Sequence, residues 1–161
     1  MNPMMTAFFD AELVEWTLRL AAAAVCGIAI GFNRDLKGKA AGTRTLGLVS
    51  LGACLVALAG LDRLGDAAGP DAVSRVVQGV LQGVLTGVGF LGAGVILKPG
   101  DSNNVRGLTT AAAVWMTAAL GIACALADWR LAALSLVLTF FVLTAPHHLA
   151  RAIGRNAPDD D

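Results

Sequence analysis

The chain has 161 residues, of which 56% are hydrophobic and 15% are charged, and its mean hydropathy is +0.68. Soluble domains usually contain about 45–50% apolar and about 25% charged residues, so this composition argues against a soluble globular protein. The formal net charge is zero, but the charged residues are concentrated in short segments between long apolar blocks.

These apolar blocks predict an all-α polytopic membrane protein, a bundle of about five transmembrane helices. We expect residues 1–12 to form a short irregular leader outside the membrane, and residues 13–146 to form the transmembrane domain. A short cytoplasmic tail, residues 147–161, follows Pro146, which is expected to end the last span. The predicted spans are Leu13–Phe32, Leu46–Leu61, Val76–Leu97, Leu108–Ala127 and Leu131–Ala145.

The first span carries two features near its ends. Glu15 and Arg19 are one helical turn apart and are expected to pair. Gly27 and Gly31 form a GxxxG pattern, which is typical of close helix packing in membranes.

The third span, VVQGVLQGVLTGVGFLGAGVIL, is uncharged and as a helix would extend about 33 Å, enough to cross the hydrocarbon core. Six of its residues are glycines, and small residues let neighbouring helices approach closely in lipid. We therefore expect this span to be the central packing helix of the bundle. Its packing glycines are Gly79, Gly83, Gly87, Gly89, Gly92 and Gly94.

Part of this span, Gly87-Val-Gly89-Phe-Leu-Gly92, also fits the GxGxxG fingerprint of dinucleotide-binding folds. That fingerprint requires a strand before the glycines and an acidic residue about 20 positions later. The flanking residues are apolar membrane sequence instead, so we disfavour a nucleotide site.

Three polar residues of the third span, Gln78, Gln82 and Thr86, recur every fourth position and share one side of the predicted helix. Hydrogen bonding between helices is the simpler interpretation, and a polar pathway is the alternative. We favour packing because neither glutamine can ionise.

The basic residues predict the orientation. Asn33–Thr45, Lys98–Gly107 and the tail hold eight of the twelve Lys and Arg residues, and the other side of the predicted membrane domain holds four. Because basic loops remain in the cytoplasm, the amino terminus is predicted to lie outside and the carboxyl terminus inside. The acidic residues are distributed the opposite way, with seven outside and five inside.

Several polar residues stand at predicted span ends on the cytoplasmic side, where the topology brings them to one level. The hydroxyls of two of them, Thr109 and Thr110, could hold an anion or a carboxylate such as that of Asp35. This set could be a functional site, a structural lock or only a topological signal. The cytoplasmic rim cluster comprises Arg34, Asp35, Arg44, Thr45, Arg106, Thr109 and Thr110.

We find no pattern of catalytic residues and no spacing of Cys or His that suggests a zinc site, so an enzyme is not expected. The three cysteines, Cys26, Cys54 and Cys124, lie within predicted spans and are expected to be buried apolar residues. We expect the lipid bilayer as a partner, no nucleic acid, and a membrane protein or a second copy as further candidates.

Three stretches resemble the membrane domain of the MgtC/SapB family: GIAIGFNRDLKGKAAGTRTLGLVSLGA, QGVLTGVGFLGAGVILK and VRGLTTAAAVWMTAALGIA. Arg34, Arg44 and Thr45 match the family pattern, and Asp35 is a conservative change. Asn33 and Leu46 depart from it, where the family usually has Glu and His. Many family members carry a cytoplasmic carboxyl-terminal domain, in place of which this sequence has a short tail.

The resemblance implies a protein of the bacterial inner membrane that is tied to magnesium limitation, acid tolerance or intracellular survival. Two hypotheses follow from it. The chain could transport Mg²⁺, which would then be a ligand or cargo and not a resident cofactor. Alternatively, it could be a non-transporting regulator that docks on a membrane complex such as the ATP synthase through its Gly-rich helix faces.

Overall fold

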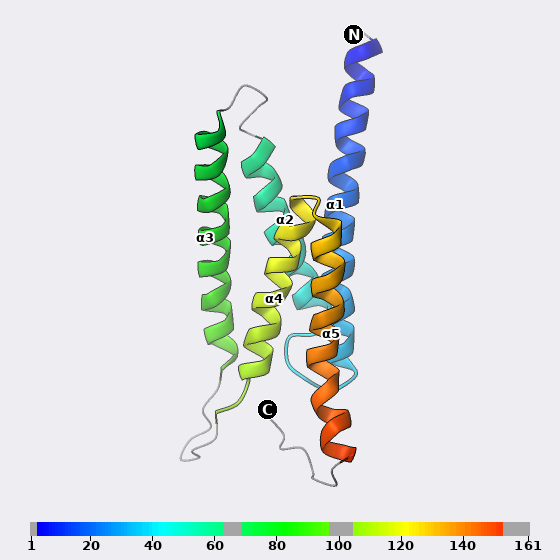
Figure 1. Ribbon diagram of the computed structural model, residues 1–161, viewed down its shortest axis with the longest axis vertical. Coiled ribbons are helices and arrows are strands. Elements are labelled where there is room, and N and C mark those ends of the chain that lie inside the picture. The colour runs from blue at the N-terminus through cyan, green and yellow to red at the C-terminus, as the bar shows by residue number, and fades with distance from the viewer. Residues whose placement is uncertain (1–2, 63–68, 97–104, 153–161) are drawn as a thin grey trace.

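The computed structural model describes residues 3–62, 69–96 and 105–152, and these residues form five α-helices (Figure 1). The all-α fold class is therefore confirmed. The helices are α1 (Pro3–Asp35), α2 (Thr43–Asp62), α3 (Pro70–Val95), α4 (Leu108–Ala125) and α5 (Trp129–Ala152).

Four helices are long and apolar enough to cross a membrane: Ala11–Asp35 within α1, and the whole of α2, α3 and α4. In α5 the apolar stretch for which side chains are described, Trp129–Thr144, is shorter. The chain is thus a polytopic membrane protein whose helices follow the predicted order. Helix α2 begins before the predicted second span and includes Arg44 and Thr45.

Three predicted boundaries are wrong. Residues expected to be an irregular leader are helical from Pro3 onward. The predicted loop before the third span is already helical at Pro70, because proline is favoured in the first helical turn and Asp71 there faces the positive end of the helix dipole. Pro146 does not end α5, which continues to Ala152, since membrane helices tolerate proline.

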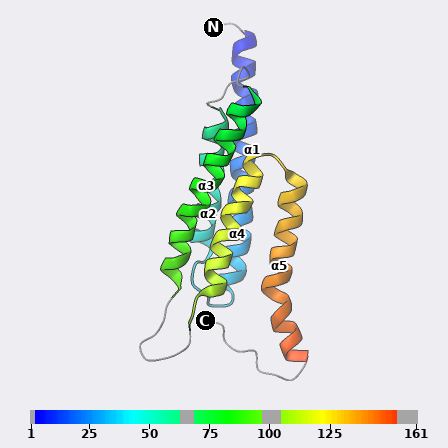
Figure 2. The same ribbon diagram turned by 60° about the vertical axis from the view of Figure 1, so that its left-hand side comes forward.

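The centre of the bundle is α4 and not the Gly-rich helix α3, which corrects the sequence-based expectation. Helix α4 packs against each of the other four helices, and most of its residues are buried. On α3, by contrast, Val88 and Gly92 are the buried residues. Figures 1 and 2 show α3 at the edge of the bundle, on the opposite side of α4 from α5.

Three glycines produce the closest approaches between helices. A Cβ atom at Gly27 or Gly31 of α1 would collide with the α2 backbone or the residue before it, and a Cβ at Gly121 of α4 would collide with the Ser50 carbonyl of α2. The predicted packing role is therefore confirmed for Gly27 and Gly31. Their missing side chains let the α1, α2 and α4 backbones come into contact.

The glycines of α3 behave differently. A Cβ at Gly92 would make an ordinary contact with Ala111 of α4, 3.5 Å away. The other five face open space within the described part of the chain, so the expectation that they pack helices inside the bundle is wrong. These are Gly79, Gly83, Gly87, Gly89 and Gly94. A residue without a side chain gains little from burial, whereas α3 anchors itself with Leu81, Val84 and Val88.

Candidate functional site at the basic end of the bundle

One end of the bundle gathers the carboxyl-terminal ends of α1, α3 and α5 with the amino-terminal ends of α2 and α4 (Figure 1). The predicted rim residues lie on these helix ends or beside them. The structure therefore confirms that the topology brings them to one level.

The most buried rim residue is Arg34, whose side chain is only 3% exposed. Its Nε and Nη2 atoms donate hydrogen bonds to the carbonyl oxygen of Ala40, at 3.2 and 3.1 Å, and Nη2 also donates to the Thr110 hydroxyl. Within the described residues, no carboxylate forms an ion pair with Arg34. A fixed positive charge therefore joins α1, the α1–α2 connection and α4.

Asp35 points to a different partner. One carboxylate oxygen accepts hydrogen bonds from the Thr43 hydroxyl and from the Thr43 backbone N–H, the latter at 2.9 Å. A Cβ at Gly42 would overlap that carboxylate, so the glycine leaves it room. Asp35 thus satisfies a free N–H at the start of α2.

The Thr109–Thr110 pair therefore does not hold Asp35, which was one of the groups considered for it. Thr110 is buried and accepts a hydrogen bond from Arg34, whereas Thr109 is exposed and faces α5. The backbone N–H and the hydroxyl of Thr43, which is closer to Asp35 in the sequence, bind its carboxylate instead.

The remaining rim residues, Arg44, Thr45 and Arg106, have exposed side chains. Arg44 and Thr45 stand at the end of a groove between α2 and α3, described below. The rim cluster is thus divided into a buried lock around Arg34 and a set of exposed polar groups.

Two further residues outside the predicted rim cluster support it. Gly107 precedes α4 with φ of 87°, a left-handed conformation that favours glycine, and a Cβ there would collide with the Val95 carbonyl. Lys37 donates a hydrogen bond from Nζ to the Leu143 carbonyl of α5, at 2.8 Å. Partial burial, together with the charges of Arg34 and Lys39, lowers the pKa of Lys37.

At the opposite end of the bundle, Arg19 forms the expected ion pair with Glu15. It also donates to the carbonyl oxygen of Ala125 in the last turn of α4, at 2.5 Å. This second bond could not be read from helical spacing, because 106 residues separate its partners.

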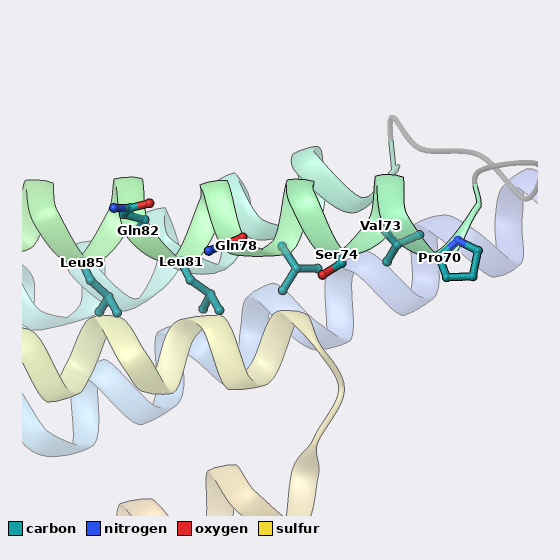
Figure 3. A pocket seen from close by; sticks show the side chains of 8 residues that line it. Pro70, Val73, Ser74, Gln78, Leu81, Gln82 and Leu85 are labelled. Atoms are coloured by element: carbon teal, nitrogen blue, oxygen red, sulfur yellow. The ribbon is translucent and has the colours of Figure 1, made fainter.

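Within the described residues, the polar stripe of α3 does not hydrogen-bond to neighbouring helices, so it does not pack helices together inside the bundle of one chain. Gln78, Gln82 and Thr86 are all exposed. The two glutamines border a shallow hollow of about 950 Å³ beside α3. In Figure 3, Leu81 and Leu85 extend from α3 toward α4, whereas Gln82 does not.

A groove of about 900 Å³ runs between α2 and α3. Four glycines, Gly52, Gly79, Gly83 and Gly87, leave its walls without side chains, and aliphatic residues such as Leu48 and Val84 line the rest. The groove therefore offers an apolar surface with a polar end at Arg44.

Among the described residues no cluster of three or more His, Cys, Asp or Glu side chains could hold a metal ion.

Comparison with known proteins identifies a family and several proteins that are similar in sequence to this chain. The MgtC family matches residues 20–152. Protein SrpB of Synechococcus elongatus is 42% identical over 79% of this chain and 70% of its own length. The protein named "Putative magnesium transporter YhiD" in Escherichia coli K12 is 37% identical over 88% of this chain and 66% of its own length.

Protein MgtC of Salmonella typhimurium is also 37% identical, over 89% of this chain. The alignment covers 56% of that relative, so the chain spans little more than half of its length. No solved structure matches the chain.

Proposed function

Because the chain belongs to the MgtC family, we propose that it acts in magnesium homeostasis, and in adaptation to low magnesium or acid, at the inner membrane of a bacterium. In this proposal it is a non-transporting regulator that docks on another membrane protein, such as the ATP synthase. The role is not enzymatic and uses no resident cofactor.

The groove between α2 and α3 is the observation that carries this proposal. Its glycines lack side chains over two turns of α3, and nothing in the described chain occupies the space beside them. A transmembrane helix of a partner could approach closely there, because small residues allow backbones to come into van der Waals contact in lipid.

The proposed orientation places the rim with Arg34 in the cytoplasm and the start of α1 outside. The excess of basic residues on the rim side supports it. In this proposal α5 crosses the membrane as a fifth helix after the four long apolar ones, and five crossings place the two ends of the described chain on opposite sides.

Transport of Mg²⁺ is the second candidate, and the printed name of the relative YhiD favours it. The buried guanidinium of Arg34 weighs against a path for Mg²⁺ past the rim of a single bundle, because a fixed cation repels a divalent cation in a low-dielectric interior.

Two measurements separate the candidates. The purified protein is reconstituted into vesicles that contain a Mg²⁺-sensitive dye, and the regulator proposal predicts the same Mg²⁺ entry as in empty vesicles. Entry that requires the protein would reject that proposal in favour of transport.

The second measurement is co-purification of partners from the native membrane. Replacing Gly83 and Gly87 by Leu fills the groove and is expected to remove the bound partner. Val137→Phe adds bulk to the exposed face of α5 and serves as the matched control. Retention of the partner by the Gly83/Gly87 variant would reject docking in this groove.

A further inference from the structure

Along one exposed side of α3 the residues are polar or small, whereas the exposed large apolar residues of this helix, Val73, Phe90 and Leu91, lie at other positions. The polar or small residues recur at intervals of three or four along the whole helix, and all are exposed. We refer to them as the polar face of α3. They are Asp71, Arg75, Gln78, Gln82, Thr86, Gly89 and Ala93.

The exposed face of α5 provides an internal comparison. There the exposed side chains are large and apolar, as expected where a helix faces lipid tails. They include Leu131, Leu134, Val137, Leu138, Phe141 and Val142. The polar face of α3 has none of these residue types, although α3 crosses the same membrane.

The polar face also has unused bonding capacity. Within the described residues, the amides of Gln78 and Gln82 form no hydrogen bonds, and neither Asp71 nor Arg75 forms an ion pair. Lipid tails cannot donate or accept hydrogen bonds, and burying an amide without a partner in an apolar medium is energetically unfavourable. A contact that supplies polar partners would remove this cost.

We propose that the polar face of α3 is the interface between two copies of this chain. Two copies share one orientation in the membrane, so a two-fold axis along the membrane normal would set their α3 helices side by side and parallel. Residues of the same number would then meet at the same depth.

A second copy fits because the face is complementary to itself. A glutamine amide both donates and accepts, so Gln78 and Gln82 can each bond their counterparts across the axis. Near one end, Asp71 of each copy lies one turn from Arg75, which permits two reciprocal ion pairs between the copies. Toward the other end, Gly89 and Ala93 allow the two backbones to approach.

This interface is separate from the groove that carries the proposed function. The groove lies between α2 and α3 and is lined by Gly79, Gly83 and Gly87, which are not part of the polar face. The chain could therefore form the dimer whether or not a partner docks, and each contact can be tested alone.

Disulfide crosslinking in native membranes tests the dimer. Gln82→Cys is expected to give an oxidant-dependent dimer, because the same position meets itself across the axis. Val137→Cys, on the lipid-facing side of α5, is the matched control and is expected to remain monomeric. The unchanged chain, whose Cys54 and Cys124 are buried and Cys26 half-buried, gives the background.

An absence of dimer for both Gln82→Cys and Gln78→Cys, or equal crosslinking of Val137→Cys, would overturn the proposal. The readout uses neither Mg²⁺ nor a partner, so its failure is distinct from failure of the proposed function.

A charge exchange tests the pairing of Asp71 with Arg75. In the Gln82→Cys background, Arg75→Asp alone places four acids together and is expected to abolish the crosslinked dimer. Adding Asp71→Arg restores one acid and one base in each copy and is expected to restore the dimer. Crosslinking that is unchanged by Arg75→Asp, or that the double exchange does not restore, would contradict the interface.

Discussion

The guanidinium of Arg34 donates a hydrogen bond to the hydroxyl of Thr110, which lies 76 residues away in the sequence. This contact joins the last turn of α1 to the first turn of α4. Because Arg34 also holds the Ala40 carbonyl, one buried side chain fixes the loop and two helices of the bundle. The rim of the membrane domain is therefore organised around a structural lock.

Replacing Arg34 by Ala is expected to destabilise the protein by about 2–3 kcal/mol, since hydrogen bonds to a charged group contribute about 1.5–3 kcal/mol. Chemical unfolding in detergent, followed by tryptophan fluorescence, measures the loss. Arg44→Ala is the control, because the Arg44 side chain is exposed. Equal stability of the two variants would show that Arg34 is not a lock.

Replacing Gly121 by Ala is expected to push α4 away from α2, because the new Cβ would collide with the Ser50 carbonyl. Overpacking of this kind costs about 1–3 kcal/mol. Gly52→Ala on α2 meets open space and should be neutral or stabilise the helix by up to about 1 kcal/mol. Thermal unfolding of both variants in the same detergent provides the measurement, and a stable Gly121→Ala variant would contradict the close approach.

Replacing Asp35 by Ala removes the acceptor that satisfies the Thr43 N–H at the start of α2. Loss of a helix cap costs about 1 kcal/mol, so a small decrease in stability is expected. Asp35→Asn keeps an oxygen acceptor and should retain much of the stability. Hydrogen exchange at the first turn of α2 reports the effect, and unchanged protection in Asp35→Ala would exclude a capping role.

Replacing Lys37 by Met removes the hydrogen bond to the Leu143 carbonyl and is expected to loosen α5, which packs against α4 over few residues. The expected cost is about 0.5–1.5 kcal/mol, the range of a single hydrogen bond. Faster amide exchange along α5, with α2 unchanged, is the expected result. Arg130→Met, at the other end of α5, is the control; identical exchange in the two variants would show that Lys37 does not hold α5.

The site could be predicted only in part. Span ends are readable, so the level shared by Arg34, Asp35 and Thr110 followed from topology alone. The hydrogen-bond partners of these residues could not be predicted in this way. A hydrogen bond depends on the rotation of each helix about its axis, and small differences in packing decide that rotation. Asp35 was considered as a ligand of Thr109 and Thr110 but accepts hydrogen bonds from Thr43, and Thr110 accepts one from Arg34 instead.

The packing partners of the Gly-rich helix α3 could not be predicted from the sequence either. Its glycines predicted close contacts between helices. A glycine indicates only that another helix can approach at that position, and it does not indicate which helix does so. Within the described chain, a Cβ added at Gly79, Gly83 or Gly87 would meet no atom within 4 Å, whereas a Cβ added at Gly121 of α4 would collide with the Ser50 carbonyl.

The sequence by itself determined that most of this chain lies in lipid, in which order its helices cross, and where its basic residues gather. These features follow from local hydropathy and length, because lipid requires each crossing helix to satisfy its own backbone. Only the tertiary structure decided that α4 is central, that α3 exposes a polar face, and that Arg34 is locked to Thr110. Those outcomes depend on which helix faces meet, and that depends on side chains far apart in the chain.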